Sequence, residues 1–201
     1  MRGTVKREDV LDVAATLFAA NGYKATSLQL VGDELSVTRQ ALYYHFRDKG
    51  EILAGLFDQL MTKLEDGVAE AALVEPPERR FGGMLRAHIV VIAENRDLAA
   101  VLLHERPEMA KLDVPEAAER RHQYMRQFSE AYADGVALGH LRPADPSVAA
   151  NALVAAANGI SWWYRSGRGG TPREVAEMVL ELLRGGFHRL QLANEQVNLV
   201  Q

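Results

Sequence analysis

The sequence contains no cysteine. This absence excludes a disulfide scaffold, a zinc site built from thiolates and a cysteine nucleophile, and it fits a reducing compartment. The N-terminal segment also lacks the apolar core of a secretory signal. We therefore expect a cytoplasmic globular protein whose function depends on other side chains.

Long hydrophobic runs are scarce as well. The nearest candidate for a membrane span is the uncharged segment 148–164, which is short and rich in alanine. Asn151, Asn158 and Ser161 place polar groups within it, which a lipid-facing helix avoids. We predict a helix that is buried on both sides, and no membrane partner.

Positive charge is in short supply. The chain has 23 Lys and Arg against 27 Asp and Glu, a net charge of −4. Residues 1–50 hold seven bases and six acids (+1), whereas the remainder holds 16 bases and 21 acids (−5). A nucleic-acid-binding domain usually carries a marked basic patch. Any DNA contact must therefore depend on where a few bases are placed.

No stretch alternates apolar and polar residues as a strand would, and no internal repeat is present. Apolar residues recur instead at helical spacing, as in Val10, Leu11, Ala14 and Phe18. We predict an all-α chain with a helix-turn-helix domain over residues 1–50 and a larger helical domain over residues 51–201. After a first helix, helices are expected at 27–35, 38–46, from 48 onward, 78–94, 97–105, 115–139, 146–165 and 172–192.

The segment TRQALYYHFRDK, residues 38–49, combines aromatic rings with bases. Helices 27–35 and 38–46 have the lengths of a helix-turn-helix. Leu42 and Phe46 would pack inward, leaving polar side chains to meet base edges and phosphates. The expected DNA contacts are Ser27, Gln29, Thr38, Arg39, Gln40, Tyr43, Tyr44, His45 and Lys49, with a basic arm formed by Arg2, Lys6 and Arg7.

Several features of this region match a known pattern: Gly22-Tyr23, Ser27, Val37, the run LYYHF at residues 42–46, and Lys49. In these features residues 7–53 resemble the DNA-binding domain of the tetracycline-repressor (TetR) family. The resemblance implies a homodimeric regulator, most often a repressor, that binds a palindromic operator. It also implies that a helical second domain binds a small-molecule effector and forms the dimer.

Two residues depart from the family pattern. Ser36 replaces the usual glycine of the turn, at a position expected to be left-handed, which would cost about 1 kcal/mol. Gly32 replaces the usual alanine of the second helix, which would cost up to about 1 kcal/mol more. Both departures predict a slightly loosened second helix.

Residues of the larger domain are assigned to a ligand pocket from their positions alone. His88 lies within an apolar stripe, where a core histidine and a polar group aimed into a pocket are both consistent with the pattern. Tyr124 and Phe128 are spaced as either core or pocket residues. The candidate ligand contacts are His88, Ile92, Leu102, Met109, Tyr124, Phe128, Trp162 and Arg165.

Helices 146–165 and 172–192 are the predicted dimer interface, because they carry more apolar surface than a monomer core needs. Beyond the Trp162–Trp163 pair, Arg165 and Arg168 flank a glycine-rich turn. The segment is similar to the corresponding region of TetR-type regulators that sense CoA thioesters. Arginines that hold an anionic head group and arginines that are merely solvated both fit this pattern.

Enzyme motifs are incomplete. His104-Glu105 begins like a zincin motif but Glu108 stands where the second histidine is needed, and no phosphate loop or Gly-x-Ser-x-Gly elbow occurs. We predict a protein that is not an enzyme and uses no metal or cofactor. The alternatives left open are a ligand-independent, architectural DNA-binding protein and an all-α enzyme.

Overall fold

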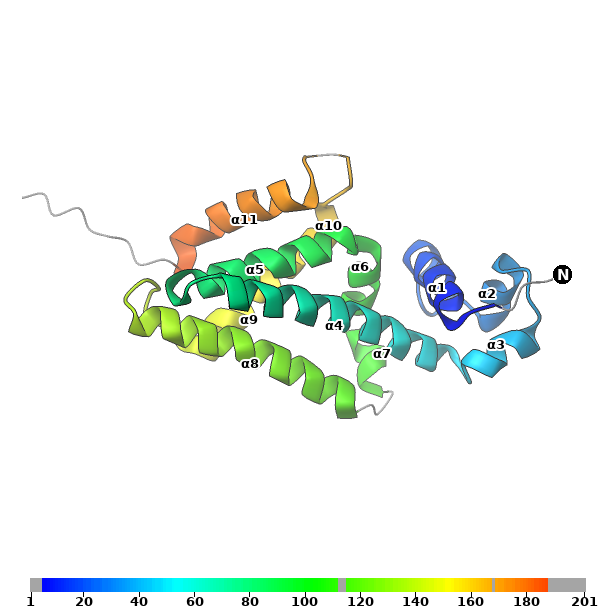
Figure 1. The fold of residues 1–201 in the computed structure, drawn as a ribbon. Helices are drawn as coiled ribbons and strands as arrows, with labels where there is room; N and C mark the ends of the chain where they lie inside the picture. The colour runs from blue at the N-terminus through cyan, green and yellow to red at the C-terminus, as the bar shows by residue number, and fades with distance from the viewer. Residues whose placement is uncertain (1–4, 112–114, 168, 188–201) are drawn as a thin grey trace, which may run out of the picture.

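The computed structural model describes residues 5–111, 115–167 and 169–187, and this part of the chain consists of helices joined by short loops (Figure 1). The predicted all-α class is confirmed. The helices are α1 (Arg7–Asn21), α2 (Leu28–Glu34), α3 (Arg39–His45), α4 (Lys49–Val74), α5 (Pro77–Glu94), α6 (Arg96–His104), α7 (Arg106–Lys111), α8 (Pro115–Ala137), α9 (Pro146–Asn158), α10 (Ile160–Trp163) and α11 (Pro172–Phe187).

Helices α1 to α3 form a small head at one end of the molecule (Figure 1). Three side chains cap its helices: the Ser27 hydroxyl accepts a hydrogen bond from the Leu30 amide (3.1 Å), Thr38 from Ala41 (3.3 Å), and Asp48 from Glu51 (2.9 Å). Each bond satisfies an amide that lacks a partner within its helix. The helix starts in this region are therefore set by local side chains.

The core of the head is small and fully buried. Leu42 and Phe46, at 0% and 1% exposed, face inward as predicted, and they meet the apolar side of α1. The guanidinium of Arg7 lies 4.8 Å from the centre of the Phe46 ring. Arg7 thus belongs to the first turn of α1 and not to a free arm. Arg2 lies outside the described residues.

The turn between α2 and α3 confirms one prediction and corrects another. Ser36 has a φ of +55°, the left-handed conformation expected from the sequence. A methyl group at Gly32, however, would lie 3.1 Å from Cδ1 of Leu42. Gly32 therefore lets Leu42 of α3 approach the backbone of α2. The sequence predicts only that this glycine loosens α2, but in the structure it also permits close packing.

Helix α4 leaves the head and continues without a break into the larger body, where it packs against α5 and α8 (Figure 1). Helix α5 is central to that body, since α4, α8, α9 and α11 all contact it. None of the helices in the described ranges combines the length and apolarity needed to cross a membrane.

Some predicted helix bounds are wrong. The helix expected over 146–165 is interrupted at Gly159, because the Ser161 hydroxyl donates to the Asn158 carbonyl (2.8 Å) and competes with the helical ladder. Helix α7 was not predicted from the sequence, and Pro107 lies in its first turn, where proline's missing N–H costs nothing. Of the helix expected over 172–192, residues 188–192 lie outside the described residues.

Candidate nucleic-acid interface and ligand cavity

Helix α3 presents a polar surface because only Leu42 of its seven residues is buried. Arg39 and Gln40 are exposed, Tyr43 is 42% exposed and Tyr44 is 85% exposed. The seven residues of α3 make about two turns. Leu42 within α3 and Phe46 directly after it are the buried side chains that hold this short helix against the rest of the head. The remaining side chains are available to a partner.

The exposed side chains are preorganised by pairs on the helix surface. The guanidinium of Arg39 donates to the Tyr43 hydroxyl from Nη2 (2.7 Å) and Nε (3.1 Å) and lies 5.2 Å from the Tyr43 ring centre. On α2, the Gln29 amide donates to the Asp33 carboxylate (2.7 Å). These are exposed i, i+4 pairs, which contribute only a few tenths of a kcal/mol and can rearrange on binding.

His45 and Lys49 are engaged within the head. The His45 Nε2–H donates to the Val5 carbonyl (2.9 Å), which ties the segment before α1 to α3. The Lys49 ammonium donates to the carbonyls of Tyr23 (2.5 Å), Lys24 (3.2 Å) and Thr26 (2.9 Å). Burial lowers the pKa of Lys49 against the opposing effect of Glu105 and Glu108.

Because the three ammonium hydrogens of Lys49 already have carbonyl acceptors, the expected contact of Lys49 with a phosphate stays a prediction that requires one of these bonds to be exchanged. Residue types do not show where backbone carbonyls lie in the fold, so the bonds of Lys49 to carbonyls could not be predicted from the sequence. Ser27 and Thr38 differ from Lys49, since a capping oxygen accepts its hydrogen bond and leaves the hydroxyl hydrogen free to donate.

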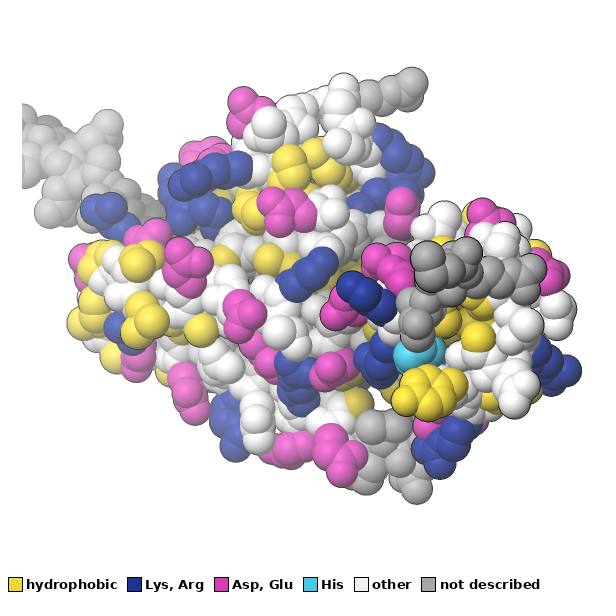
Figure 2. Space-filling view, turned by 45° about the vertical axis from the view of Figure 1, so that its right-hand side comes forward, with side chains coloured by type: hydrophobic (Ala, Val, Ile, Leu, Met, Phe, Trp, Pro, Cys, Tyr) yellow, Lys and Arg dark blue, Asp and Glu magenta, His cyan; other side chains and the backbone are white. Residues whose placement is uncertain are grey.

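Figure 2 shows a histidine beside a hydrophobic side chain on the face of the head, with Lys and Arg side chains nearby.

A cavity of about 870 Å³ lies in the larger body. Its wall is contributed by α4, α5, α6, α7, α8 and α9. This volume lies within the range of about 300–1,000 Å³ that is usual for small-molecule sites. Five of the predicted ligand residues line it: His88, Ile92, Leu102, Met109 and Tyr124.

Three predicted ligand residues lie elsewhere. Phe128 is fully buried beside the cavity, in ring contact with Phe81 (6.1 Å) and Tyr124 (5.3 Å), so it belongs to the core. Trp162 is 75% exposed on the outside of the body. Arg165 is exposed, and its Nη1 donates to the Tyr164 carbonyl (3.0 Å). Arg168 lies outside the described residues.

A buried polar group closes one part of the cavity wall. His88 Nε2 lies 3.0 Å from Oδ1 of Asn158, and Nδ1 lies 2.8 Å from the Tyr124 hydroxyl. Because an amide oxygen can only accept, the imidazole carries its proton on Nε2 and its Nδ1 accepts from Tyr124. Burial lowers the pKa of His88 to about 4, although the bond to Asn158 favours the charged form.

His88 is therefore a neutral histidine whose two ring nitrogens both have hydrogen-bond partners. It fits both interpretations of the sequence, a core histidine and a polar group at a cavity. It is buried like a core residue and yet lines the cavity. Burial, assisted by the charge of Glu65, raises the pKa of Tyr124 and keeps its hydroxyl protonated. The Nδ2 hydrogens of Asn158 are then the donors that this group can offer to a bound molecule.

Other lining residues were not identified from the sequence. From α4 come apolar side chains, and from α8 and α9 come polar ones; they include Phe57, Leu60, Met61, Leu64, Arg121, His122, Arg126, Ser147, Asn151 and Asn158. Asn151 and Asn158 had a usable signal, because they are polar residues inside an uncharged run. The apolar face of α4 had none, since core and cavity demand the same residue types.

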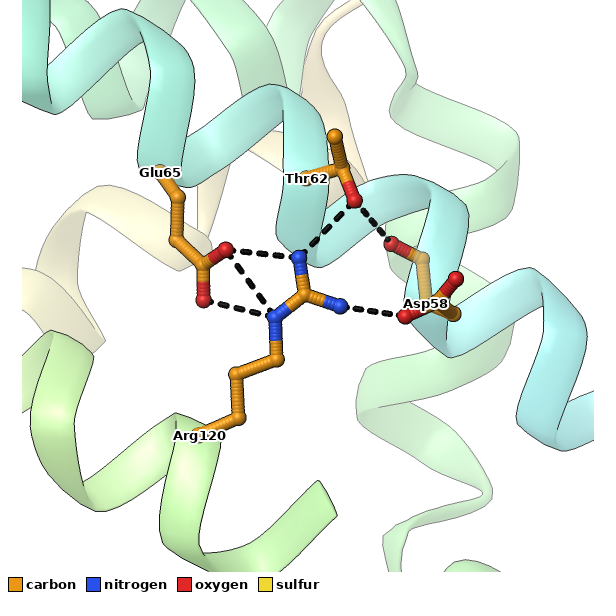
Figure 3. Close-up of polar contacts among 4 residues, drawn as sticks. All are labelled: Asp58, Thr62, Glu65 and Arg120. Atoms are coloured by element: carbon orange, nitrogen blue, oxygen red, sulfur yellow. Dashed lines mark hydrogen bonds and ion pairs between the residues drawn. The ribbon is translucent and has the colours of Figure 1, made fainter. Parts of the chain in front are cut away.

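Two helices of the cavity wall, α8 and α4, are joined by a cluster of polar contacts (Figure 3). The Arg120 guanidinium on α8 donates to both carboxylate oxygens of Glu65 (2.6 to 2.9 Å), to the Thr62 hydroxyl (2.8 Å) and to Asp58. These carboxylates raise the pKa of Arg120. The three α4 residues occupy successive turns of its outer side. Arg120 thus fastens α8 to the helix that leads to the head.

Models of known families match most of the chain. A model described as bacterial regulatory proteins of the tetR family matches residues 10–56. A second, described as the tetracyclin repressor-like C-terminal domain, matches residues 74–187, which is more than half of the chain. The first includes α3, and the second includes most of the cavity wall.

Individual relatives agree with this match. The HTH-type transcriptional repressor KstR2 of Mycobacterium tuberculosis is 25% identical over 191 residues, which span 90% of this chain and 92% of KstR2. The solved KstR2 structure, a ketosteroid transcriptional regulator, has a TM-score of 0.84 at 21% identity and covers 94% of this chain and 97% of its own. AibR in complex with isovaleryl coenzyme A and operator DNA has a TM-score of 0.76 at 22% identity, covering 88% and 96%.

Proposed function

The chain belongs to the tetR family of bacterial regulators, and we propose that it is a homodimeric repressor that a small, largely apolar ligand releases from a palindromic operator. The observation that carries the proposal is the path of α4. This helix begins at Lys49 beside the head and, from about two turns further on, lines the cavity with Phe57, Leu60, Met61 and Leu64.

The head would read the operator through α3. Arg39, Gln40, Tyr43 and Tyr44 are the side chains available to base edges and phosphates. Ser27, Gln29 and Thr38 would add contacts to the backbone of the DNA. His45 and Lys49 would serve mainly to hold the segments around α3 in place, because their donors already bond to carbonyls.

The dimer would form through α9, α10 and α11. These helices expose large apolar side chains that a monomer leaves in water, namely Val148 (66%), Trp162 (75%), Trp163 (58%), Met178 (51%) and Leu182 (82%). Exposed apolar side chains of this size favour an interface, and a two-fold axis would let these helices cover their copies. Pairing there would set the spacing of the two heads on adjacent major grooves.

Release would follow from a shift between two head spacings. A ligand changes that equilibrium only if it binds one arrangement better than the other. In this chain a ligand that displaces α8 would act on α4 directly through its apolar wall and through the Arg120 cluster. The cavity thus favours a ligand-responsive regulator over a ligand-independent architectural DNA-binding protein.

An acyl-CoA thioester is a candidate ligand, since AibR, with the same fold, holds isovaleryl coenzyme A together with operator DNA. Arg165, a candidate for holding an anionic head group, does not line the cavity. The head group of such a ligand would therefore be held by other residues. The described side chains that line the cavity favour ligand binding, as expected of the family, over an enzymatic reaction.

The test is a selection of bound fragments from the host's fragmented genome with the purified full chain and no added ligand. Recovery of a short palindrome near a few genes supports the proposal, and retention of the fragments by a folded dimer without preference for sequence would contradict it. The Tyr43→Phe variant should weaken binding of the recovered site by about tenfold, the loss of roughly one hydrogen bond. Its melting temperature should stay within a degree of wild type because Tyr43 is exposed; an equal loss of stability would place Tyr43 in the head's core.

A further inference from the structure

The charged side chains that line the cavity are all basic. Arg121 and Arg126 of α8 belong to its wall, with His122 between them in sequence, and no acidic residue lies among the described residues that line it. The chain as a whole has a net charge of −4, so this bias does not follow from composition. The side chains that line the cavity therefore carry a positive charge balance within an acidic protein.

These side chains stand at the solvent-facing edge of the cavity. Arg121, His122 and Arg126 are exposed, as are Ser147 and Asn151 across from them on α9. The wall contributed by α4 and α5 is apolar and buried at Leu60, Met61, Leu64 and Ile92. The cavity therefore has an apolar interior and a polar, basic mouth.

The two arginines are available for a ligand. Within the described part of the chain, Arg121 has no hydrogen-bond or ion-pair partner. Arg126 has one contact, with Glu119 at 3.5 Å, and since both side chains are more than half exposed this pair contributes little. The neighbouring Arg120 differs, because its guanidinium is already occupied by Asp58, Thr62 and Glu65.

Both arginines border the same cavity. Arg121 and Arg126 are five residues apart, about 7.5 Å along the helix axis and about 140° around it, and their long side chains border the cavity from either side of Met125. A planar guanidinium donates two parallel hydrogen bonds to a carboxylate or a phosphate. His122 adds a ring N–H donor next to them.

We propose that the cavity selects an amphiphile whose apolar body lies between α4, α5 and α9 and whose carboxylate or phosphate head is held at the mouth by Arg121, His122 and Arg126. This inference rests on the proposed function only in taking the cavity for the effector site. Neutral and cationic molecules of the same apolar body would bind less tightly. The head-group site is then on α8, and not at the glycine-rich turn near Arg165.

The experiment uses four probes with one apolar chain: decanoate, decyl phosphate, decanol and decylamine, each below the concentration at which it forms micelles. Binding to the full chain is measured by calorimetry at two salt concentrations. We expect decanoate or decyl phosphate to bind at least tenfold more tightly than decanol, and this preference to shrink as salt screens the exposed arginines. The tighter of the two anions identifies the head group.

The variants separate charge from shape. Replacing both arginines, Arg121→Ala with Arg126→Ala, should lower anion affinity by about tenfold or more and leave decanol binding unchanged. Arg121→Glu should reverse the preference and improve decylamine binding. Arg79→Ala and Arg173→Ala, which remove exposed bases outside the cavity wall, are matched controls and should behave as wild type.

Equal binding of decanol and the anions, unchanged anion binding by the double variant, or binding of none of the four probes would each overturn the proposal. Operator binding is measured separately on the same proteins. If the protein binds an operator and a neutral compound releases it, the proposed head-group site is contradicted but the proposed regulatory function is supported. If the anions bind through Arg121 and Arg126 but no operator is recovered, the proposed head-group site is supported and the proposed regulatory function is contradicted.

Discussion

The head and the larger body of this protein are built on different scales. In the head, the caps at Ser27 and Thr38, the Arg39–Tyr43 pair and the left-handed turn at Ser36 all depend on residues close together in sequence. In the body, the His88 group joins three helices, with partners 36 and 70 residues away. The comparison teaches that a short motif can specify a surface, whereas a cavity requires the whole tertiary structure.

The largest effect is expected from Leu42→Ala, which tests how far the head depends on one buried contact. Removing this fully buried side chain should lower the free energy of unfolding by about 2–5 kcal/mol. Operator binding should be lost at temperatures where the body still binds its ligand. Thermal unfolding and calorimetry measure the two properties, and Leu30→Ala, at a 37% exposed position of α2, is the control. Ligand binding that fails together with the head would show that the two regions are not separable.

The second prediction concerns pH and the body. The pKa of folded His88 is lowered from 6.5 to about 4, so its contribution to stability is present above pH 6.5 and is lost as the pH falls towards 4. A difference of 2.5 pKa units corresponds to about 3 kcal/mol. Urea unfolding at pH 7 and pH 4.5 should therefore show a smaller loss for His88→Gln than for wild type. His122→Gln, at the exposed mouth, should keep the wild-type pH dependence; an identical slope for all three proteins would mean that His88 is not neutral in the fold.

The third prediction tests whether Lys49 belongs to the framework of the head or to its DNA contacts. Lys49→Met should lower the free energy of unfolding by about 1–3 kcal/mol, because three carbonyls lose a charged donor. The salt dependence of operator binding should be unchanged, since no phosphate contact is removed. A slope flatter by about one would restore Lys49 to the phosphate contacts. Arg47→Met, which removes an exposed base nearby, is the comparison.

The smallest effect is expected at the turn. Ser36→Gly should raise the free energy of unfolding by up to about 1 kcal/mol, because a φ of +55° strains any residue with a side chain. Operator affinity should change by less than twofold. Chemical denaturation measures the gain, with Ser27→Gly, which removes a cap, as a control that should lose stability. A loss at Ser36 would mean that its hydroxyl has a role that the turn geometry does not explain.

Much of the fold followed from sequence because its signals are local. Helical spacing, capping residues and the LYYHF run placed α1 to α4 and the polar face of α3. Five of the eight predicted ligand residues line the cavity, and their contact with a ligand stays a prediction. The other three predicted ligand residues, Phe128, Trp162 and Arg165, do not line the cavity. Periodicity shows that Phe128 and Trp162 lie on apolar faces, but it does not show whether such a face meets a core, a cavity or water.

The sequence by itself determined the family, the helical class and the polar face of α3, because these depend on residues within a few turns of one another. Only the tertiary structure decided which side chains are already in use. Lys49 is bonded to carbonyls 23 to 26 residues away, Arg120 is fastened to α4 55 to 62 residues away, and Arg121 beside it is left free at the mouth of the cavity. Adjacent arginines have the same chemistry in sequence, and the packing of α8 against α4 alone gives them different partners.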